Sequence, residues 1–463
     1  MITAAMTSQA PATQTYTLKK TLVLWQLVMI GLAYIQPMTV FDTFGIVGKE
    51  SGNHVPTAYF IALLAMLFTA LSYGHMVRKY PSAGSAYTYA QKSLTPSVGF
   101  LVGWASLLDY VFMPMINILL AKIYLATLFP GIPGWIFIVG LALMMTIINL
   151  KGIELVAHFN AVIVFFQLAV MAVFLWLVIK GIYFDAAGAG TLLSSDPFFT
   201  TDLKITGVVA GATILCFSFL GFDGLSSLSE ETVDPAKNIP RAIFLTTLIG
   251  GVIFIITTYF LQLYFPRAEL AIKDLDASQP ELFLYVAGKG FQAFGLCFSI
   301  ATVFASGMAA HAGVSRLMYV MGRDNIFPKR IFGFIHPTLR TPSFNVMFVG
   351  LIAISGISFS LEEALHLVNF GALTAFTFVN ISVIAQFYIR EGRRKTVKDT
   401  VKFLILPLIG ALAIGLLWVN LEMASIERGL IWVALGVLYL ACITKGFRKY
   451  PEAFRQGTMP ALD

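Results

Sequence analysis

Residues 211–241 read GATILCFSFLGFDGLSSLSEETVDPAKNIPR, an apolar helix that is interrupted and then followed by charged residues. Gly221 weakens the helix at the interruption, because glycine loses more backbone entropy on folding than other residues. Asp223 follows within the apolar run, and an ionisable residue at membrane depth is expensive and usually functional. A broken apolar helix that carries a carboxylate is typical of proteins that hold a polar solute inside a bilayer. The segment therefore predicts an all-α, polytopic membrane protein.

The composition agrees with a membrane protein that has no large soluble domain. The chain has 463 residues, of which 58% are hydrophobic and only 12% charged, whereas about one quarter of a soluble protein is charged. Apolar stretches of at least about 18 residues, each long enough to cross the hydrocarbon core, recur along the chain. We expect twelve transmembrane helices, at residues 21–47, 56–78, 97–127, 133–150, 155–180, 204–231, 241–265, 290–322, 343–360, 362–389, 401–420 and 426–446.

The basic residues predict the orientation. With the N-terminus inside, most of the 31 Lys and Arg residues fall on the inner side, as is typical of cytoplasmic loops. Both termini are therefore expected in the cytoplasm, with a disordered N-terminus at 1–18 and a tail at 447–463. This topology signal explains the net charge of +7 without a nucleic-acid partner. The basic stretch Arg390–Lys402 is interpreted as an inner anchor, with a lipid-specific site as the alternative.

A second interruption lies in the first span. Pro37 lacks a backbone N–H and clashes with the preceding turn, so the helix should stop near Ile35–Gln36. The break in the sixth span is expected at Ser218–Gly221. Two broken helices five spans apart predict inverted repeats at 19–181 and 204–390, followed by two further spans at 401–446. Backbone groups left unpaired at the breaks should face a midplane binding site, because lipid cannot hydrogen-bond them.

Several motifs resemble the amino acid–polyamine–organocation transporter superfamily. They are PSAGSAYTYAQKSLTPSVGFLVGW at 81–104, SEETVDPAKNIPRAI at 229–243 and SRLMYVMGRDNIFPK at 315–329. Within the superfamily, GLAYIQPMTVFDTFGIV and VNFGALTAFTFVN look very like bacterial putrescine importers. The resemblance implies a fold of five-plus-five inverted repeats with broken helices 1 and 6. It also implies alternating access and proton-coupled import across the bacterial inner membrane.

Two departures from the superfamily pattern bear on the substrate and on coupling. Amino acid carriers usually have Gly-Ser-Gly at the first break, where amides hold the substrate α-carboxylate, but this chain has Gln36-Pro37-Met38. Since proline has no amide N–H, the departure favours a substrate without a carboxylate, such as a diamine. A carrier of cationic or neutral amino acids, or an amine antiporter, stays the alternative. Gln167 stands where some proton-coupled relatives have a lysine, and it cannot titrate.

Asp223 is the first candidate substrate ligand, and a structural role such as pairing within the helix bundle is the alternative. A carboxylate in low dielectric forms a strong, charge-assisted hydrogen bond with an ammonium, and the resemblance implies an acid here near the substrate amine. Asp109 and Tyr110 could hold the second ammonium of a diamine through a carboxylate and an aromatic face. The equal alternatives are that Asp109 holds a neighbouring helix and that Tyr110 packs in the core.

Asp42 is interpreted as a gating or proton-carrying residue, with a cap at the outer vestibule as the equal alternative. Glu230 and Glu231 are expected to form an inner-gate ion network with Lys237 and Arg241, with contact to the substrate as the alternative. The further candidate substrate contacts, for which ordinary packing is the alternative, are Gln36, Phe217, Ser218, Phe219, Gly221, Phe222, His311, Asn369 and Thr374.

No catalytic residue, cofactor or metal site is predicted. The sequence shows no phosphate-binding loop, no paired-cysteine spacing and no nucleophile motif. An ion gradient rather than ATP is therefore expected to drive transport, with a small amine and protons as the solutes. A membrane-embedded enzyme or a receptor is disfavoured, because neither a reactive constellation nor an output domain is visible.

Overall fold

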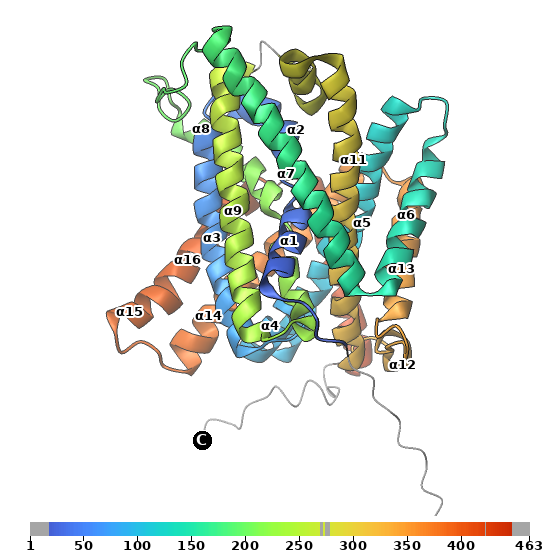
Figure 1. Cartoon of the computed structure of the whole chain (residues 1–463). Coiled ribbons are helices and arrows are strands. Elements are labelled where there is room, and N and C mark those ends of the chain that lie inside the picture. The colour runs from blue at the N-terminus through green and yellow to red at the C-terminus, as the bar shows by residue number, and fades with distance from the viewer. Residues whose placement is uncertain (1–17, 269–271, 274–277, 422, 447–463) are drawn as a thin grey trace, which may run out of the picture.

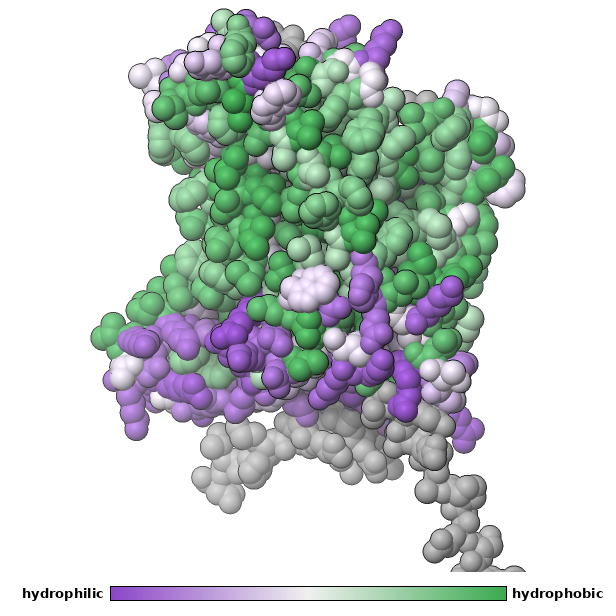
Figure 2. All heavy atoms as spheres, viewed as in Figure 1, coloured by the Kyte–Doolittle hydropathy of each residue, from purple (hydrophilic) through white to green (hydrophobic). Residues whose placement is uncertain are grey.

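The computed structural model describes residues 18–268, 272–273, 278–421 and 423–446. Long helices run side by side through these ranges (Figure 1). Figure 2 shows an apolar band across the face in view, with a hydrophilic layer at its foot. We call this foot the basic end, because the helices α4 (Ser85–Ser93), α12 (Lys329–Phe332) and α15 (Val397–Thr400) lie there in Figure 1 and carry Lys92, Lys329 and Lys398. The predicted terminal segments fall outside the described ranges, apart from Leu18.

Nine helices among the described residues are long and apolar enough to cross a bilayer, and a bent pair makes a tenth. The bent pair is α1 (Leu24–Ile35) with α2 (Thr39–Glu50), and the others are α3 (Val55–Lys79), α5 (Pro96–Leu128), α6 (Gly134–Lys151), α7 (Ile153–Phe184), α9 (Pro235–Tyr264), α11 (Ser278–Arg323), α14 (Leu361–Val383) with η4 (Ile384–Arg390), α15 (Val397–Thr400) with η5 (Val401–Ile405) and α16 (Leu406–Val419), and α17 (Met423–Ile443). The structure confirms an all-helical membrane protein.

The sixth and ninth predicted spans contain shorter helices. These are α8 (Ile205–Cys216) and α13 (Ser343–Ile354), which continues into η3 (Ser355–Ser358). Neither is long enough to pass as a span by itself. The count of twelve spans therefore stays a prediction, although a helix lies in each of the twelve predicted ranges.

Two helical segments lie where no span was predicted. Helix α4 (Ser85–Ser93) occupies the connection between α3 and α5, and α11 begins well before the predicted eighth span. A kink at Gly288, with φ of 77°, separates this extra segment from the rest of α11. Such segments are too short or too polar to produce the hydropathy signal of a membrane span.

Both predicted interruptions are present. Helix α1 ends at Ile35, Gln36 adopts the left-handed conformation with φ of 50°, and α2 leaves at 45° to α1. Helix α8 ends at Cys216, and the chain continues as η1 (Phe217–Phe219) and η2 (Asp223–Glu231), two 3-10 helices. The second half of the sixth predicted span is therefore a 3-10 helix and not an α-helix.

Three serine hydroxyls stabilise η2. Ser226, Ser227 and Ser229 each donate a hydrogen bond of 2.6–2.7 Å to the backbone carbonyl three residues earlier. Serine competes with the backbone in this way and favours tight turns over a regular α-helix. The serine-rich sequence thus explains why the chain after the break winds as a 3-10 helix and brings Asp223 inward.

A short backbone connection joins the two broken spans at the basic end. The amides of Thr21 and Leu22 donate to the carbonyl of Glu231 at 2.9 and 3.0 Å, and the amide of Val233 donates to the carbonyl of Leu22 at 2.9 Å. The pairing is recognised as an isolated parallel bridge between Leu22 and Thr232. We call these three hydrogen bonds the Leu22–Thr232 bridge.

Candidate functional site

Two carboxylates lie deep in the bundle without a basic partner. Asp223 begins η2 with 0% of its surface exposed, and Asp109 of α5 is 3% exposed. Among the residues that the structure describes, neither forms an ion pair. Asp223 lies close enough to Asp109 for their charges to interact. Burying charged carboxylates without a partner is strongly unfavourable, so the pair is suited to binding a cation or a proton.

Four tyrosines surround the two carboxylates. The Tyr110 hydroxyl donates a hydrogen bond to Asp223 Oδ2, whereas Oδ1 has no hydrogen-bond partner in the structure. The hydroxyls of Tyr34, Tyr73 and Tyr89 are also buried without a partner. Asp223 is near enough to interact electrostatically with all three of these tyrosines. We call the six residues the acid–tyrosine cluster.

The cluster combines the two features that bind an alkylammonium ion. A carboxylate pairs with the charged nitrogen, and an aromatic face attracts the cation while covering the methylene chain. Phe222 extends the aromatic wall, with its ring centroid 5.9 Å from that of Tyr73 and 5.4 Å from that of Phe376. The unpaired Oδ1 of Asp223 and the unpaired phenol hydroxyls would supply the hydrogen-bond partners of a bound amine.

A cavity of about 360 Å³ lies beside the two helix breaks. Its lining includes Gln36 and Asp42 from the first broken span, Ser218 from the second, and Asn117 of α5. The Tyr124 hydroxyl is 3.5 Å from Asp42 Oδ1, at the limit of a hydrogen bond. We call this space the Asp42 cavity, because it contains the one carboxylate among its described lining residues.

Tyr34 connects the Asp42 cavity with the acid–tyrosine cluster, since it belongs to both. Its ring lies against Gly221, where a Cβ atom would overlap it, and a Cβ on Gly224 would come within 2.7 Å. Gly221 also has φ of 107°, which favours glycine. Glycine at these two positions therefore allows the ring to lie directly on the second helix break.

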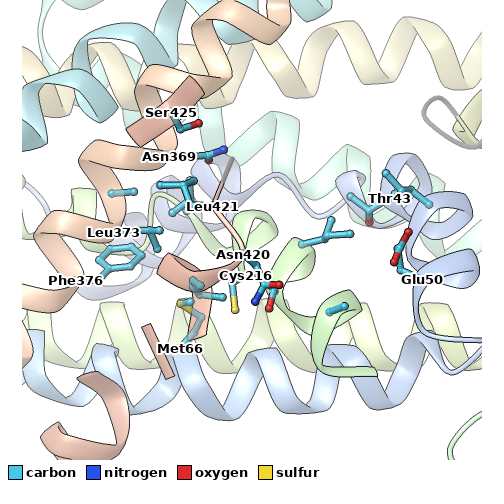
Figure 3. A pocket seen from close by; sticks show the side chains of 17 residues that line it. Thr43, Glu50, Met66, Cys216, Asn369, Leu373, Phe376, Asn420, Leu421 and Ser425 are labelled. Atoms are coloured by element: carbon cyan, nitrogen blue, oxygen red, sulfur yellow. The ribbon is translucent and has the colours of Figure 1, made fainter. Parts of the chain in front are cut away.

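A larger cavity of about 580 Å³ adjoins the first, since both are lined by Thr43, Ile46 and Leu220. Figure 3 shows Asn369, Phe376 and Asn420 among the side chains around it. Glu50, at the end of α2, lies on its rim. Both cavities are lined by residues of α2, and the larger one also by residues of α8, and Figure 1 shows these two helices toward the end of the molecule opposite the basic end.

The structure brings together several of the predicted site residues. Asp109, Tyr110 and Asp223 meet in the acid–tyrosine cluster, with Gly221 and Phe222 beside them. The predicted contacts Gln36, Asp42 and Ser218 line the Asp42 cavity, and Asn369 lines the larger one.

Other predicted contacts lie elsewhere. Phe219 packs edge-on against Phe254 at 5.4 Å, His311 Nε2 is 2.8 Å from the carbonyl oxygen of Val346, and Thr374 donates at 2.8 Å to the carbonyl of Phe370 in its own helix. None of these three residues lines either cavity. The side chain of Phe217 falls outside the part of the chain that the structure describes.

The predicted partners of Glu230 and Glu231 are wrong. Both acids lie in ion pairs at the basic end, but the cations come from α11 rather than α9. Glu231 pairs with Arg316 through both carboxylate oxygens, and Glu230 accepts from Arg323 at 2.9 Å. Lys237 and Arg241 are exposed on α9 instead. Spacing in sequence suggested the nearest basic residues, whereas the fold places the end of η2 against α11.

Three tyrosines of the cluster, Tyr34, Tyr73 and Tyr89, were not identified from the sequence. Tyrosine on an apolar helix is usually core packing, and the chain has 17 of them. Tyr34 carried a usable signal, because it lies two residues before the break at Gln36. Tyr73 and Tyr89 gave no such signal, since their proximity to Asp223 depends on how α3 and α4 pack.

Comparison with known proteins identifies the family of this chain. The amino acid permease family model matches residues 26–425. The low-affinity putrescine importer PlaP of Escherichia coli K12 is 62% identical over 438 residues, which cover 95% of this chain and 96% of the importer. The methylthioribose transporter and the branched-chain amino acid permease BcaP of Bacillus subtilis are 27% and 26% identical, and each match covers 91% of this chain and 92% of the relative. These matches confirm the prediction of a transporter rather than an enzyme, and the chain belongs to the amino acid permease family.

Proposed function

We propose that this transporter imports putrescine or a closely related diamine. The observation that carries the proposal is the buried pair Asp109 and Asp223, which lacks a basic partner among the described residues. Two carboxylates balance the two charges of a diamine, whereas an amino acid would bring a carboxylate of its own into an already acidic site. The high identity to a putrescine importer supports the same conclusion.

In the proposed binding mode, one ammonium pairs with the free oxygen of Asp223 and the other with Asp109. The rings of Tyr34, Tyr73 and Tyr110 cover the four-carbon chain between them. A charge-assisted hydrogen bond at each end would favour a substrate of matching length. The residues at the first break support this mode, because Pro37 provides no amide for a substrate carboxylate.

We further infer that the transporter works by alternating access within twelve spans and two inverted repeats. The buried pair of Glu231 and Arg316 and the Leu22–Thr232 bridge hold the basic end together, and both cavities lie away from it. With the basic end in the cytoplasm of a bacterium, the amine would enter through the larger cavity and pass Asp42 and Tyr34. The two broken spans with α3 and α9 would then rock against the remaining helices.

Protons are the proposed coupling ion, with the buried carboxylates as their acceptors. A proton on Asp42, Asp109 or Asp223 would remove a charge that attracts the amine and so favour its release. The membrane potential would add to this, because an inside-negative potential drives a cation inward by about 2.3 kcal/mol per charge per 100 mV.

Uptake of labelled putrescine into proteoliposomes tests the proposal, with the pH gradient and the membrane potential imposed separately. An inward proton gradient at clamped potential should drive uptake, and excess diamine but not excess lysine or arginine should block it. Asp223→Asn should abolish uptake, whereas Asp202→Asn, which removes an exposed carboxylate, should leave it unchanged. Uptake that requires internal substrate, or inhibition by an amino acid, would instead indicate an exchanger or an amino acid carrier.

A further inference from the structure

A second cluster of charges lies at the basic end, away from the acid–tyrosine cluster. The rings of Phe387 in η4 and Phe403 in η5 stack with their centroids 4.9 Å apart. The guanidinium of Arg393 lies 5.3 Å from the first ring centroid and 5.5 Å from the second, and Lys402 Nζ lies 5.1 Å from the ring of Phe403. These are cation–π distances, so the two rings hold two cations close together.

Further cations converge on the same place from other segments. Arg78, at the end of α3, and Lys398, in α15, lie close enough to Lys402 to repel its charge, as does Arg393. The end of α3 and the continuous stretch 393–402 therefore contribute to one positive surface. We call Arg78, Arg393, Lys398 and Lys402 the Phe403 basic cluster.

The nearby acids do not neutralise this cluster. Glu391 is shared between Arg393 at 2.8 Å and Lys79 at 3.2 Å. Asp399 accepts a hydrogen bond of 2.8 Å from Thr396 in the cap of α15 and attracts Lys402 only as one of several charges. Among the described residues, Arg78 and Lys402 form no ion pair. An anion bound between the four cations would replace their repulsion by attraction.

The surroundings of the cluster are those of a membrane boundary. Large apolar side chains on the same segments are exposed, namely Ile389, Val397, Val401 and Ile405. Figure 2 shows the apolar band passing into the hydrophilic layer where α15 and α16 lie in Figure 1. An anion bound at this boundary would have the cations of the Phe403 basic cluster on one side and exposed apolar side chains on the other.

We propose that the Phe403 basic cluster binds the phosphate of an anionic phospholipid, with the acyl chains along the exposed face of η5 and α16. Basic pockets at a helix–membrane boundary recognise such headgroups, and arginine is well suited to phosphate oxygens. The phosphate would bridge Arg78 of α3 to the cations of the segment after α14. Because α3 belongs to the group of helices proposed to move, the lipid would also affect transport. The binding itself does not depend on which solute is transported.

The proposal is tested with the purified full-length protein in detergent. Phosphatidylglycerol or cardiolipin should raise the temperature of unfolding and remain bound in native mass spectra, whereas phosphatidylethanolamine should do neither. Inorganic phosphate at millimolar concentration distinguishes the two sources of the anion. A shift of the same size with inorganic phosphate alone would show a site for free anions and overturn the lipid assignment.

Matched variants separate this site from general surface charge. Arg78→Gln with Lys402→Gln should lose most of the lipid-induced shift, whereas Arg394→Gln with Lys395→Gln removes the same charge from the same end and should keep it. An equal loss in both pairs would overturn the proposal in favour of a diffuse basic surface. If the first pair of substitutions folds poorly, Arg78→Lys with Lys402→Arg provides a second test, because it keeps both charges. This variant should show the lipid-induced rise in unfolding temperature. Its absence would contradict a phosphate site.

Discussion

The hydroxyl of Tyr110 donates a hydrogen bond to one oxygen of Asp223 and leaves the other oxygen of that carboxylate unpaired. Tyr110 therefore orients the carboxylate without neutralising it. A cation that approaches the free oxygen meets an acceptor that is already aligned, among buried side chains. In the proposed binding mode, this carboxylate oxygen would be the first contact of the substrate amine.

Tyr110→Phe is expected to raise the KM of putrescine uptake by about 10-fold, because the Asp223 carboxylate then loses the hydrogen bond that orients it toward the amine. The measurement is the concentration dependence of initial uptake in proteoliposomes. Tyr285→Phe, which alters an exposed tyrosine, should change nothing. An unchanged KM in Tyr110→Phe would remove this hydroxyl from substrate binding.

Asp109→Asn distinguishes a ligand for the second ammonium from a structural carboxylate. If Asp109 binds the distal amine, the variant should lose affinity for putrescine while competition by the monoamine butylamine becomes no weaker. The measurement compares inhibition constants of the two amines in wild type and variant. A parallel loss for both amines would show that Asp109 holds the helices and does not touch the second charge.

Breaking the buried pair of Arg316 and Glu231 should destabilise the fold by about 3–5 kcal/mol, because one charge is then left buried alone. Arg316→Met is therefore expected to lower the unfolding temperature more than the double variant Arg316→Met with Glu231→Leu. Arg323→Met, which alters the half-exposed pair with Glu230, should have a smaller effect. A double variant less stable than the single one would contradict this account.

Asp324 follows the end of α11, outside the membrane spans, and its carboxyl group should make the stability of the protein depend on pH. Burial raises the pKa of this carboxyl, although Tyr87 donates a hydrogen bond of 2.8 Å to it. The folded protein thus binds this proton more tightly than the unfolded chain. The contribution to stability is greatest below the unfolded pKa and is lost as the pH rises through the folded pKa.

Asp324→Asn removes this titration while keeping an oxygen that accepts from Tyr87. The unfolding temperature of the variant should exceed that of wild type near neutral pH, and the difference should shrink as the pH falls. Thermal unfolding of both proteins between about pH 4 and pH 8 covers the range in which a raised Asp pKa acts. If the difference in unfolding temperature instead grew toward acid pH, the pKa of Asp324 would be lowered in the folded protein and not raised.

The breaks were predictable from the sequence because single residues determine them locally. Pro37 removes a backbone donor, and Gly221 permits a backbone that other residues avoid. The acidic members of the site were also predictable, since an aspartate in an apolar helix stands out. The partners of Glu231 and the positions of Tyr73 and Tyr89 were not, because these depend on contacts between helices far apart in sequence.

The Leu22–Thr232 bridge uses only backbone groups, so side-chain substitutions along it need not remove its hydrogen bonds. Sequence drift in this segment can therefore leave the connection intact. Hydrogen exchange at the bridge would also report how often the basic end opens. If the basic end opens in each cycle, the amide hydrogens of Thr21, Leu22 and Val233 exchange with deuterated solvent at the rate of that opening, and substrate that speeds the cycle speeds their exchange.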